Sequence, residues 1–338
     1  MAAEKIKITE PFPLEAGGVL PGVEIAWHSF GILNRAGDNV IWVCHALTAN
    51  SDVSEWWPGM VGPGLLLDTD KYFIICANIL GSCYGSTGPM SVNPQTGKPW
   101  YRSFPLITFR DVVRGHELVR KHLGIKKIQM IIGGSIGGQQ ALEYAIMYPD
   151  LFERLAFLAS SVRYAPWGIA FSQSMRLAIE ADPTFEQDIR GGGSKGLRAA
   201  RSVALLSYRN DAIYNKLQKE DDENKLTDFR ASSYQNYQGD KLVKRFDAYT
   251  YYLLTLLSDT HNVGRGRGGV EKALQKVKAR VLSLGISSDL LFPVYEQKYL
   301  AEHVKNGKYV EIDSLYGHDG FLVETEKITE IIKPFLDE

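Results

Sequence analysis

One stretch of the sequence, Ile128–Tyr148, limits the possible fold more than any other. It begins with an apolar, β-prone run, continues through a glycine-rich turn around Ser135, and ends in a segment whose apolar residues recur with helical period. The turn has the Gly-x-Ser-x-Gly spacing of a nucleophile elbow, in which a serine occupies a strained turn between a strand and a helix. The glycines let the strand and the helix approach closely. We therefore predict that Ser135 is a nucleophile at the end of a central strand.

Two other interpretations of these glycine-rich segments compete with the elbow. A glycine-rich turn after a strand could bind a phosphate, but Gly133–Gly138 matches neither Gly-x-Gly-x-x-Gly nor the P-loop, which ends in Gly-Lys-Ser/Thr. Cys83 lies in another glycine-rich loop and is a second candidate nucleophile. Its turn is less suited to nucleophilic attack, so we expect Cys83 to be structural.

The remaining pattern predicts an α/β fold with a mostly parallel central sheet flanked by helices. Short buried runs that are typical of strands occur at 23–31, 39–44, 71–78, 128–132, 154–159, 280–286 and 308–313. Thr108, with Asp111 three residues later, is the start signal of a helix that ends at Gly124. Further helices are expected over 294–305 and after Gly320.

The pattern changes after Ser160, and residues 165–265 contain helix-like segments without a convincing strand. An insertion at this point would lie above the carboxyl edge of the sheet, as a lid over Ser135. We therefore divide the chain into a first part of the core (1–164), a helical lid (165–265) and a second part of the core (266–338). The glycine-rich run at 264–269 is expected to return the chain to the core, although its two arginines could also meet phosphates.

Composition limits the choice of partners and compartment. The chain has 338 residues, 45% of them hydrophobic and 23% charged, and a net charge of −1, which gives no reason to expect nucleic acid or an anionic membrane as a partner. The first residues lack the apolar region of a signal peptide, and no long uncharged apolar run follows, so we expect a cytoplasmic protein. Three scattered cysteines indicate neither a disulfide framework nor a zinc site. We expect no metal.

A serine nucleophile needs a base, and the base needs an orienting carboxylate, which in this kind of sheet follow the serine in the order acid, then histidine. Of the three later histidines, His318 lies in a loop just past a strand, the position from which a base reaches the elbow. Asp289 follows the preceding strand in the same way, and we predict it as the orienting acid. Asp313 is a rival, but it ends the strand that leads to His318 and is better explained as a turn residue.

Backbone amides near Ser135 would stabilise the negative charge that forms during acyl transfer. The amide of Ile136, directly after the serine, is one expected donor. The second is expected from the loop that follows the strand at 39–44, where Leu47 is our candidate.

Six motifs spread along the chain are more specific than the elbow alone. They are His45–Thr48, Asn78–Pro89, Phe104–Asp111, Gly133–Gly138, Tyr237–Asp247 and Tyr316–Asp319. Together they resemble the homoserine O-acetyltransferase family, from about residue 10 to the C-terminus. The resemblance implies an α/β-hydrolase fold with a helical lid and acetyl transfer from acetyl-CoA to L-homoserine on the route to methionine. It also implies a homodimer, acetyl-CoA as a co-substrate, and no permanently bound cofactor.

The resemblance also assigns substrate contacts. Arg201 and Tyr208 match the lid residues that bind homoserine, and Asp319 matches the residue that meets its ammonium group. A zwitterionic amino acid needs a cation and an anion, so the pairing makes chemical sense. From the helix pattern alone, however, a surface ion pair would be the better interpretation of Arg201.

Several functions stay open at this stage. A succinyl-CoA donor or a serine acceptor would use the same machinery, and so would an esterase with the same three residues. A non-catalytic binding module on this fold is a further alternative, which the intact spacing of serine, acid and base argues against.

Overall fold

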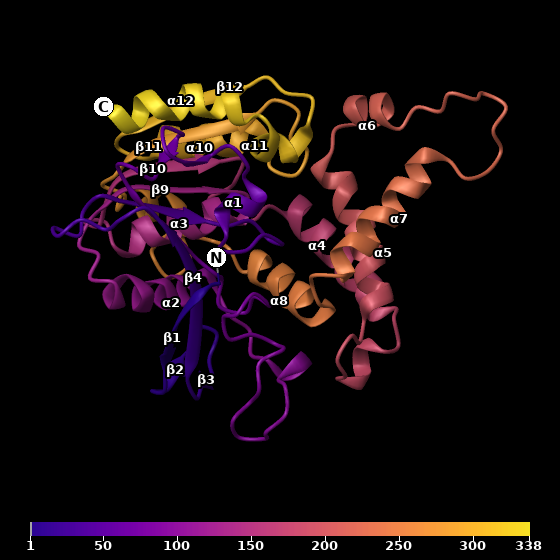
Figure 1. Cartoon of the computed structure of the whole chain (residues 1–338), viewed down its shortest axis with the longest axis horizontal. Coiled ribbons are helices and arrows are strands. Elements are labelled where there is room, and N and C mark those ends of the chain that lie inside the picture. The colour runs from indigo at the N-terminus through magenta and orange to yellow at the C-terminus, as the bar shows by residue number, and fades with distance from the viewer. Residues whose placement is uncertain (1) are drawn as a thin grey trace.

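The computed structural model describes residues 2–338, and its centre is an eight-stranded sheet (Figure 1). In spatial order the strands are β1 (Glu4–Ile8), β4 (Val23–Phe30), β8 (Phe73–Ala77), β5 (Val40–Cys44), β9 (Ile128–Gly134), β10 (Phe152–Leu158), β11 (Arg280–Ile286) and β12 (Gly307–Ile312). Strand β4 is antiparallel to both of its neighbours, and the strands from β8 to β12 are parallel. The predicted mostly parallel α/β sheet is therefore confirmed.

Strand β1 was not predicted. Lysines alternate with isoleucines in it, and it forms an edge whose side chains are at most half-buried. An edge strand that keeps its side chains in water carries a weak apolar signal. Two small ribbons complete the strands, β2 (Phe12–Pro13) with β3 (Val19–Leu20) and β6 (Val61–Gly62) with β7 (Leu67–Asp68).

Helices cover both faces of the sheet. Those of the core are α1 (Val53–Trp56), α2 (Phe109–His122), α3 (Ile136–Met147), α9 (Val270–Leu274), α10 (Val294–His303), α11 (Gly320–Val323) and α12 (Thr325–Asp337), with short 3-10 turns η1 (Tyr101–Ser103) and η3 (Gly317–Asp319). Trp42 and Cys44 pack in one apolar cluster with α2 and α3, whereas Ile41 and Val43 pack in another with α1 and α12. This alternation follows from the two-residue period of a strand. The capping box of Thr108 and Asp111 is present at the start of α2, as predicted.

Between β10 and β11, which are adjacent in the sheet, α9 is preceded along the chain by α4 (Pro166–Glu180), the 3-10 turn η2 (Phe185–Gln187), α5 (Ser194–Tyr208), α6 (Asp211–Leu217), α7 (Arg230–Val243) and α8 (Ala248–Asp259). Helix α4 packs against both α5 and α8, and α5 packs against α7. Helices α5, α6 and α7 project away from the sheet at the right of Figure 1. None of the described helices combines the length and the apolar content needed to cross a lipid bilayer.

The glycine-rich return at 264–269 is held by ion pairs. Arg265 Nη2 lies 3.0 Å from Glu15 Oε2, and Arg267 Nη1 donates to Glu143 Oε2 at 3.0 Å. Glu143 is almost completely buried in α3. Both arginines therefore have partners within the fold, and the structure gives them an anchoring role instead of an open phosphate site.

Candidate active site

Ser135 occupies a strained backbone conformation between β9 and α3, with φ 58° and ψ −130°. A non-glycine residue at positive φ costs free energy and marks a position fixed by its surroundings. The neighbouring glycines make the turn possible, since a Cβ on Gly133 would lie 2.4 Å from the carbonyl carbon of Gly137. A Cβ on Gly137 would lie 2.2 Å from the carbonyl oxygen of Cys44. Strand, turn and helix therefore meet at contact distance around Ser135.

His318 and Asp289 form a buried hydrogen-bonded pair, with His318 Nδ1 2.7 Å from Asp289 Oδ2. The other carboxylate oxygen of Asp289 accepts hydrogen bonds from the amides of Leu291 and Phe292, at 2.8 and 2.9 Å. An acceptor at Nδ1 places the imidazole proton there, which leaves Nε2 as the basic nitrogen. Ser135 and His318 line the same cavity.

Three aromatic rings surround the imidazole of His318. The ring centroids of Phe292 and Phe321 lie 5.2 Å from that of His318, and the centroid of Tyr208 lies 5.7 Å away. These rings come from three different parts of the chain, namely the loop after β11, α11 and the end of α5. They fix the plane of the imidazole ring.

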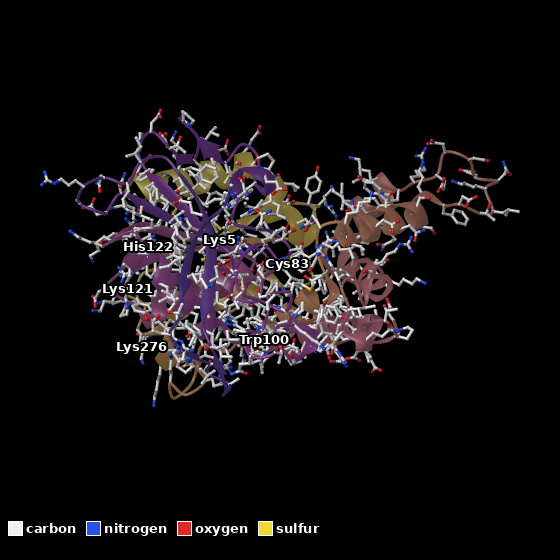
Figure 2. All side chains as sticks on the ribbon, turned by 60° about the horizontal axis from the view of Figure 1, so that its bottom comes forward. Lys5, Cys83, Trp100, Lys121, His122 and Lys276 are labelled. Carbon is white, nitrogen blue, oxygen red and sulfur yellow. The ribbon has the colours of Figure 1, made fainter. Side chains whose placement is uncertain are left out.

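The rival residues lie elsewhere. His261 is buried with Nε2 2.9 Å from the carbonyl oxygen of Ser161, and burial lowers its pKa to about 3. His303 is in α10, and Asp313 accepts from Ser287 Oγ at 3.0 Å. Cys83, labelled in Figure 2, is mostly buried, and burial raises the pKa of its thiol to about 12. A thiol in that environment stays protonated and is a poor nucleophile.

The predicted oxyanion donors both lie beside the serine. Leu47 and Ile136 line a cavity together with Ser135. As the first residue of α3, Ile136 has an amide without an acceptor inside the helix. The loop that carries Leu47 is fixed by Gln140, whose Nε2 donates to the carbonyl oxygen of His45 at 3.0 Å.

Two small cavities meet at Ser135, and both are also lined by Leu47 and Tyr208. The first has a volume of about 20 Å³; its other walls are Ile136, Tyr164, Ser172, Met175, Ser207, Thr255, Ser258, Leu291 and Phe292. The second has a volume of about 70 Å³; its other walls are Ala46, Thr48, Arg201, His318, Asp319, Phe321 and Leu322. The first is uncharged along its walls, and the second contains a cation and a carboxylate.

The cation and the carboxylate of the second cavity differ in whether they have a partner of opposite charge. The Arg201 guanidinium lies 5.5 Å from the ring centroid of Tyr208 and forms no ion pair with any residue from 2 to 338. Asp319, by contrast, has a partner, since Arg209 Nη2 lies 3.2 Å from its Oδ2. Burial raises the pKa of Asp319, and the positive charge of Arg209 opposes that rise.

Arg209 was not among the residues predicted from the sequence. It follows the last residue of α5 and precedes the cap of the next helix, so it belongs to no periodic pattern. The only available signal was its place directly after Tyr208.

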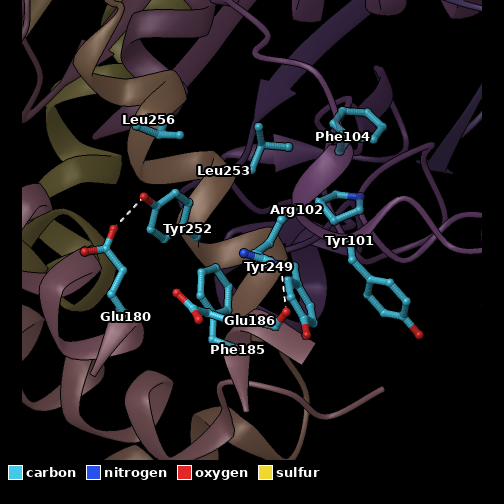
Figure 3. Close-up of a pocket in the computed structure, with 11 residues that line it drawn as sticks. Tyr101, Arg102, Phe104, Glu180, Phe185, Glu186, Tyr249, Tyr252, Leu253 and Leu256 are labelled. Atoms are coloured by element: carbon cyan, nitrogen blue, oxygen red, sulfur yellow. Dashed lines mark hydrogen bonds between the residues drawn. The ribbon is translucent and has the colours of Figure 1, made fainter. Parts of the chain in front are cut away.

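A larger cavity, of about 370 Å³, lies on another side of α8 (Figure 3). Leu253 and Leu256 of α8 line it, whereas Thr255 and Ser258 of the same helix line the first cavity at Ser135. Its remaining walls are mostly aromatic rings with two glutamates and an arginine, and no serine, cysteine or histidine is among them. Size alone therefore does not identify the reactive site.

Known proteins with this sequence pattern and this shape can now be compared. The family model described as alpha/beta hydrolase fold matches residues 39–325. A homoserine O-acetyltransferase from Cyclobacterium marinum is 45% identical, over 99% of this chain and 95% of its own length. The crystal structure of a homoserine O-acetyltransferase from Bacillus anthracis superposes with a TM-score of 0.91 at 26% identity, covering 100% of this chain and 98% of the other.

An acetylester hydrolase from Corynebacterium glutamicum has the same fold, with a TM-score of 0.88 at 24% identity over 99% of this chain and 96% of its own. At that identity the likeness extends to the fold alone. The identity to the acetyltransferase of Cyclobacterium marinum is much higher, at 45% over nearly the full length of both chains. The chain belongs to the homoserine O-acetyltransferase family within the alpha/beta hydrolase fold.

Proposed function

We propose that this protein transfers an acetyl group from acetyl-CoA to the side-chain hydroxyl of L-homoserine. The observation that carries the proposal is the cavity that joins Ser135 and His318 to Arg201 and Asp319. A nucleophile and a base supply acyl-transfer chemistry, and a cation opposite a carboxylate suits the two charged ends of an amino acid. Membership of the family supports the same activity.

In the first step His318 Nε2 takes the hydroxyl proton of Ser135, and Oγ attacks the thioester carbonyl. The amides of Leu47 and Ile136 stabilise the tetrahedral oxyanion, each donor contributing about 3 kcal/mol by analogy with measured cases. The C–S bond breaks, and coenzyme A leaves as a thiol with the proton from His318. An acetyl-serine remains.

In the second step the homoserine hydroxyl gives its proton to His318 and attacks the acetyl carbonyl. The bond from that carbon to Ser135 Oγ breaks, and the serine recovers the proton. Arg201 and Tyr208 would hold the substrate carboxylate and Asp319 its ammonium, so that the hydroxyl faces the acyl group. Asp289 keeps the imidazole oriented and stabilises its positive charge in both steps.

The small uncharged cavity favours acetyl over succinyl as the transferred group. Its volume of about 20 Å³ is close to the minimum that holds one water molecule. The described residues that line it include no lysine, arginine or histidine to neutralise the terminal carboxylate of a succinyl group. The methyl group of an acetyl is smaller than a succinyl chain and carries no charge that a cation would have to neutralise.

We also propose a structural role for the inserted helices, a pathway, a compartment and an oligomeric state. Residues 165–265 act as the lid, the product enters methionine biosynthesis, and the enzyme works as a cytoplasmic homodimer. An esterase with the same triad is the nearest alternative, but water as acceptor gives no use to an unpaired Arg201 beside Asp319.

The decisive experiment assays the purified protein with acetyl-CoA and succinyl-CoA, each against homoserine, serine and water. We expect acetyl-CoA with homoserine to give the highest kcat/KM and parallel double-reciprocal lines, the mark of a ping-pong order. Intersecting lines would replace the acyl-enzyme with a ternary complex. A preference for water would make the protein an esterase.

A further inference from the structure

We propose that Arg209 is a positioning residue for the acceptor site, which keeps Asp319 ionised and aimed at the ammonium group of homoserine. This inference rests on the proposed function and deepens it. It assigns a role to a charged side chain that does not line the cavity at Ser135.

The first support is the geometry of the ion pair. Arg209 Nη2 lies 3.2 Å from Asp319 Oδ2, and the two side chains are 23% and 16% exposed. A carboxylate removed from water to this extent requires a partner to remain charged. Because Arg209 engages Oδ2, the second oxygen of Asp319 stays available to a ligand in the cavity.

The second support is the way in which Arg209 itself is held. Its Nη2 donates to the hydroxyl of Tyr234 on α7 at 3.3 Å, and the Tyr234 ring meets that of Tyr214 edge-on at 5.9 Å. Its backbone lies against the loop of the catalytic histidine, since a Cβ on Gly317 would be 2.8 Å from the carbonyl carbon of Arg209. The guanidinium is therefore fixed by α7 and η3, and the backbone of the same residue is fixed against η3.

The third support is the balance of charge around Asp319. It faces Arg201 from α5, Arg209 directly after that helix, His318 beside it, and Asp289 from the loop after β11. Burial and Asp289 favour its neutral form, and the cations oppose them. Arg201 is needed for the substrate carboxylate, so Arg209 is the cation that can serve Asp319 throughout the cycle.

The test compares Arg209→Met, Arg209→Lys and Asp319→Asn with the unchanged enzyme. Arg209→Met should raise the KM for homoserine about ten- to a hundredfold, the range for loss of a charged hydrogen bond. It should also move the acid limb of kcat/KM for homoserine to higher pH by about one unit or more, because Asp319 then protonates more easily. Arg209→Lys should recover most of both effects. Formation of the acetyl-enzyme from acetyl-CoA should stay within about twofold, since Asp319 has no part in that step.

Combining the changes separates positioning from a general structural role. In the Asp319→Asn background there is no carboxylate to keep ionised, so adding Arg209→Met should leave the homoserine KM nearly unchanged. If the losses of the two single variants simply multiply in the double variant, Arg209 acts through the fold and the inference is wrong. This comparison remains valid if Arg209→Met by itself lowers the stability of the protein. Arg198→Met is a matched control, because Arg198 lies on α5, the helix that Arg209 directly follows, but pairs with Asp240 at the surface.

The outcomes also distinguish this inference from the proposed function. If the unchanged enzyme transfers no acetyl group to homoserine, both fall together. If it does, and Arg209→Met keeps its homoserine KM and pH profile, only the role of Arg209 is overturned.

Discussion

Nδ1 of His318 and Oδ2 of Asp289 are 2.7 Å apart, although 29 residues separate them in the sequence. Two parallel strands, β11 and β12, produce this contact, because their carboxyl ends lie side by side. Replacing Asp289 by Asn should lower kcat on the order of 10³- to 10⁴-fold, since an amide cannot stabilise the imidazolium and favours the wrong tautomer. Steady-state kinetics above and below neutral pH would measure the loss. A fall of less than tenfold would exclude Asp289 as the orienting acid.

Ser135→Ala should abolish both release of coenzyme A and formation of product, because no acetyl-enzyme can form. The control is the melting temperature, which should stay close to that of the unchanged protein, because alanine is no larger than serine and fits the same site. Mass spectrometry after mixing with acetyl-CoA should detect an added acetyl group only in the unchanged enzyme. Product formation by Ser135→Ala above a trace would favour direct transfer.

Arg201→Ala should separate the two half-reactions. The first acylation should continue at nearly its normal rate, whereas the homoserine-dependent step should lose about ten- to a hundredfold, the value of a charged hydrogen bond of about 1.5–3 kcal/mol. Hydrolysis of the acetyl-enzyme then becomes a larger share of turnover. Rapid-mixing measurements of the two steps would decide the matter. Loss of the acylation burst with a normal homoserine response would remove Arg201 from the acceptor site.

The burial of His116 predicts how acid affects the stability of the folded protein. It is completely buried in α2, neither ring nitrogen has a hydrogen-bond partner within residues 2–338, and burial lowers its pKa to about 3. The unfolded chain therefore binds a proton below about pH 6.5 that the folded protein does not, so stability falls as the pH drops.

Replacing His116 by Phe should accordingly reduce the loss of stability between pH 7.5 and pH 5 by about 2 kcal/mol, the cost of one suppressed protonation over 1.5 pH units. Denaturant unfolding of both proteins at the two pH values measures the difference. The ring should fit between Trp42 and Tyr144, which the histidine already contacts. Equal pH dependence in the two proteins would show that His116 is not the group responsible.

The sequence was sufficient to predict those features that depend on residues close together along the chain. The elbow at Ser135, the buried strands and the cap at Thr108 are each encoded by residues close to one another in the sequence, so a mostly parallel sheet flanked by helices could be predicted. The aromatic rings around His318 could not, because they come from three separate segments that only the folded chain brings together. Arg209 was missed for the same reason, since its partner Asp319 is supplied by a distant loop. Strand β1 was missed because half of it faces water.

The helix α5 carries Arg201 and Tyr208 and is followed at once by Arg209, while Ser135, Asp289 and His318 all lie on loops of the core sheet. In the proposed mechanism, the residues that make and break the acyl bond and those that choose its acceptor thus occupy different parts of the chain. On this proposal, we expect substitutions in α5 to redirect the acyl group to a new acceptor without disturbing the groups that activate it. Such a division lets closely similar folds diverge between transfer and hydrolysis through changes in a single replaceable segment.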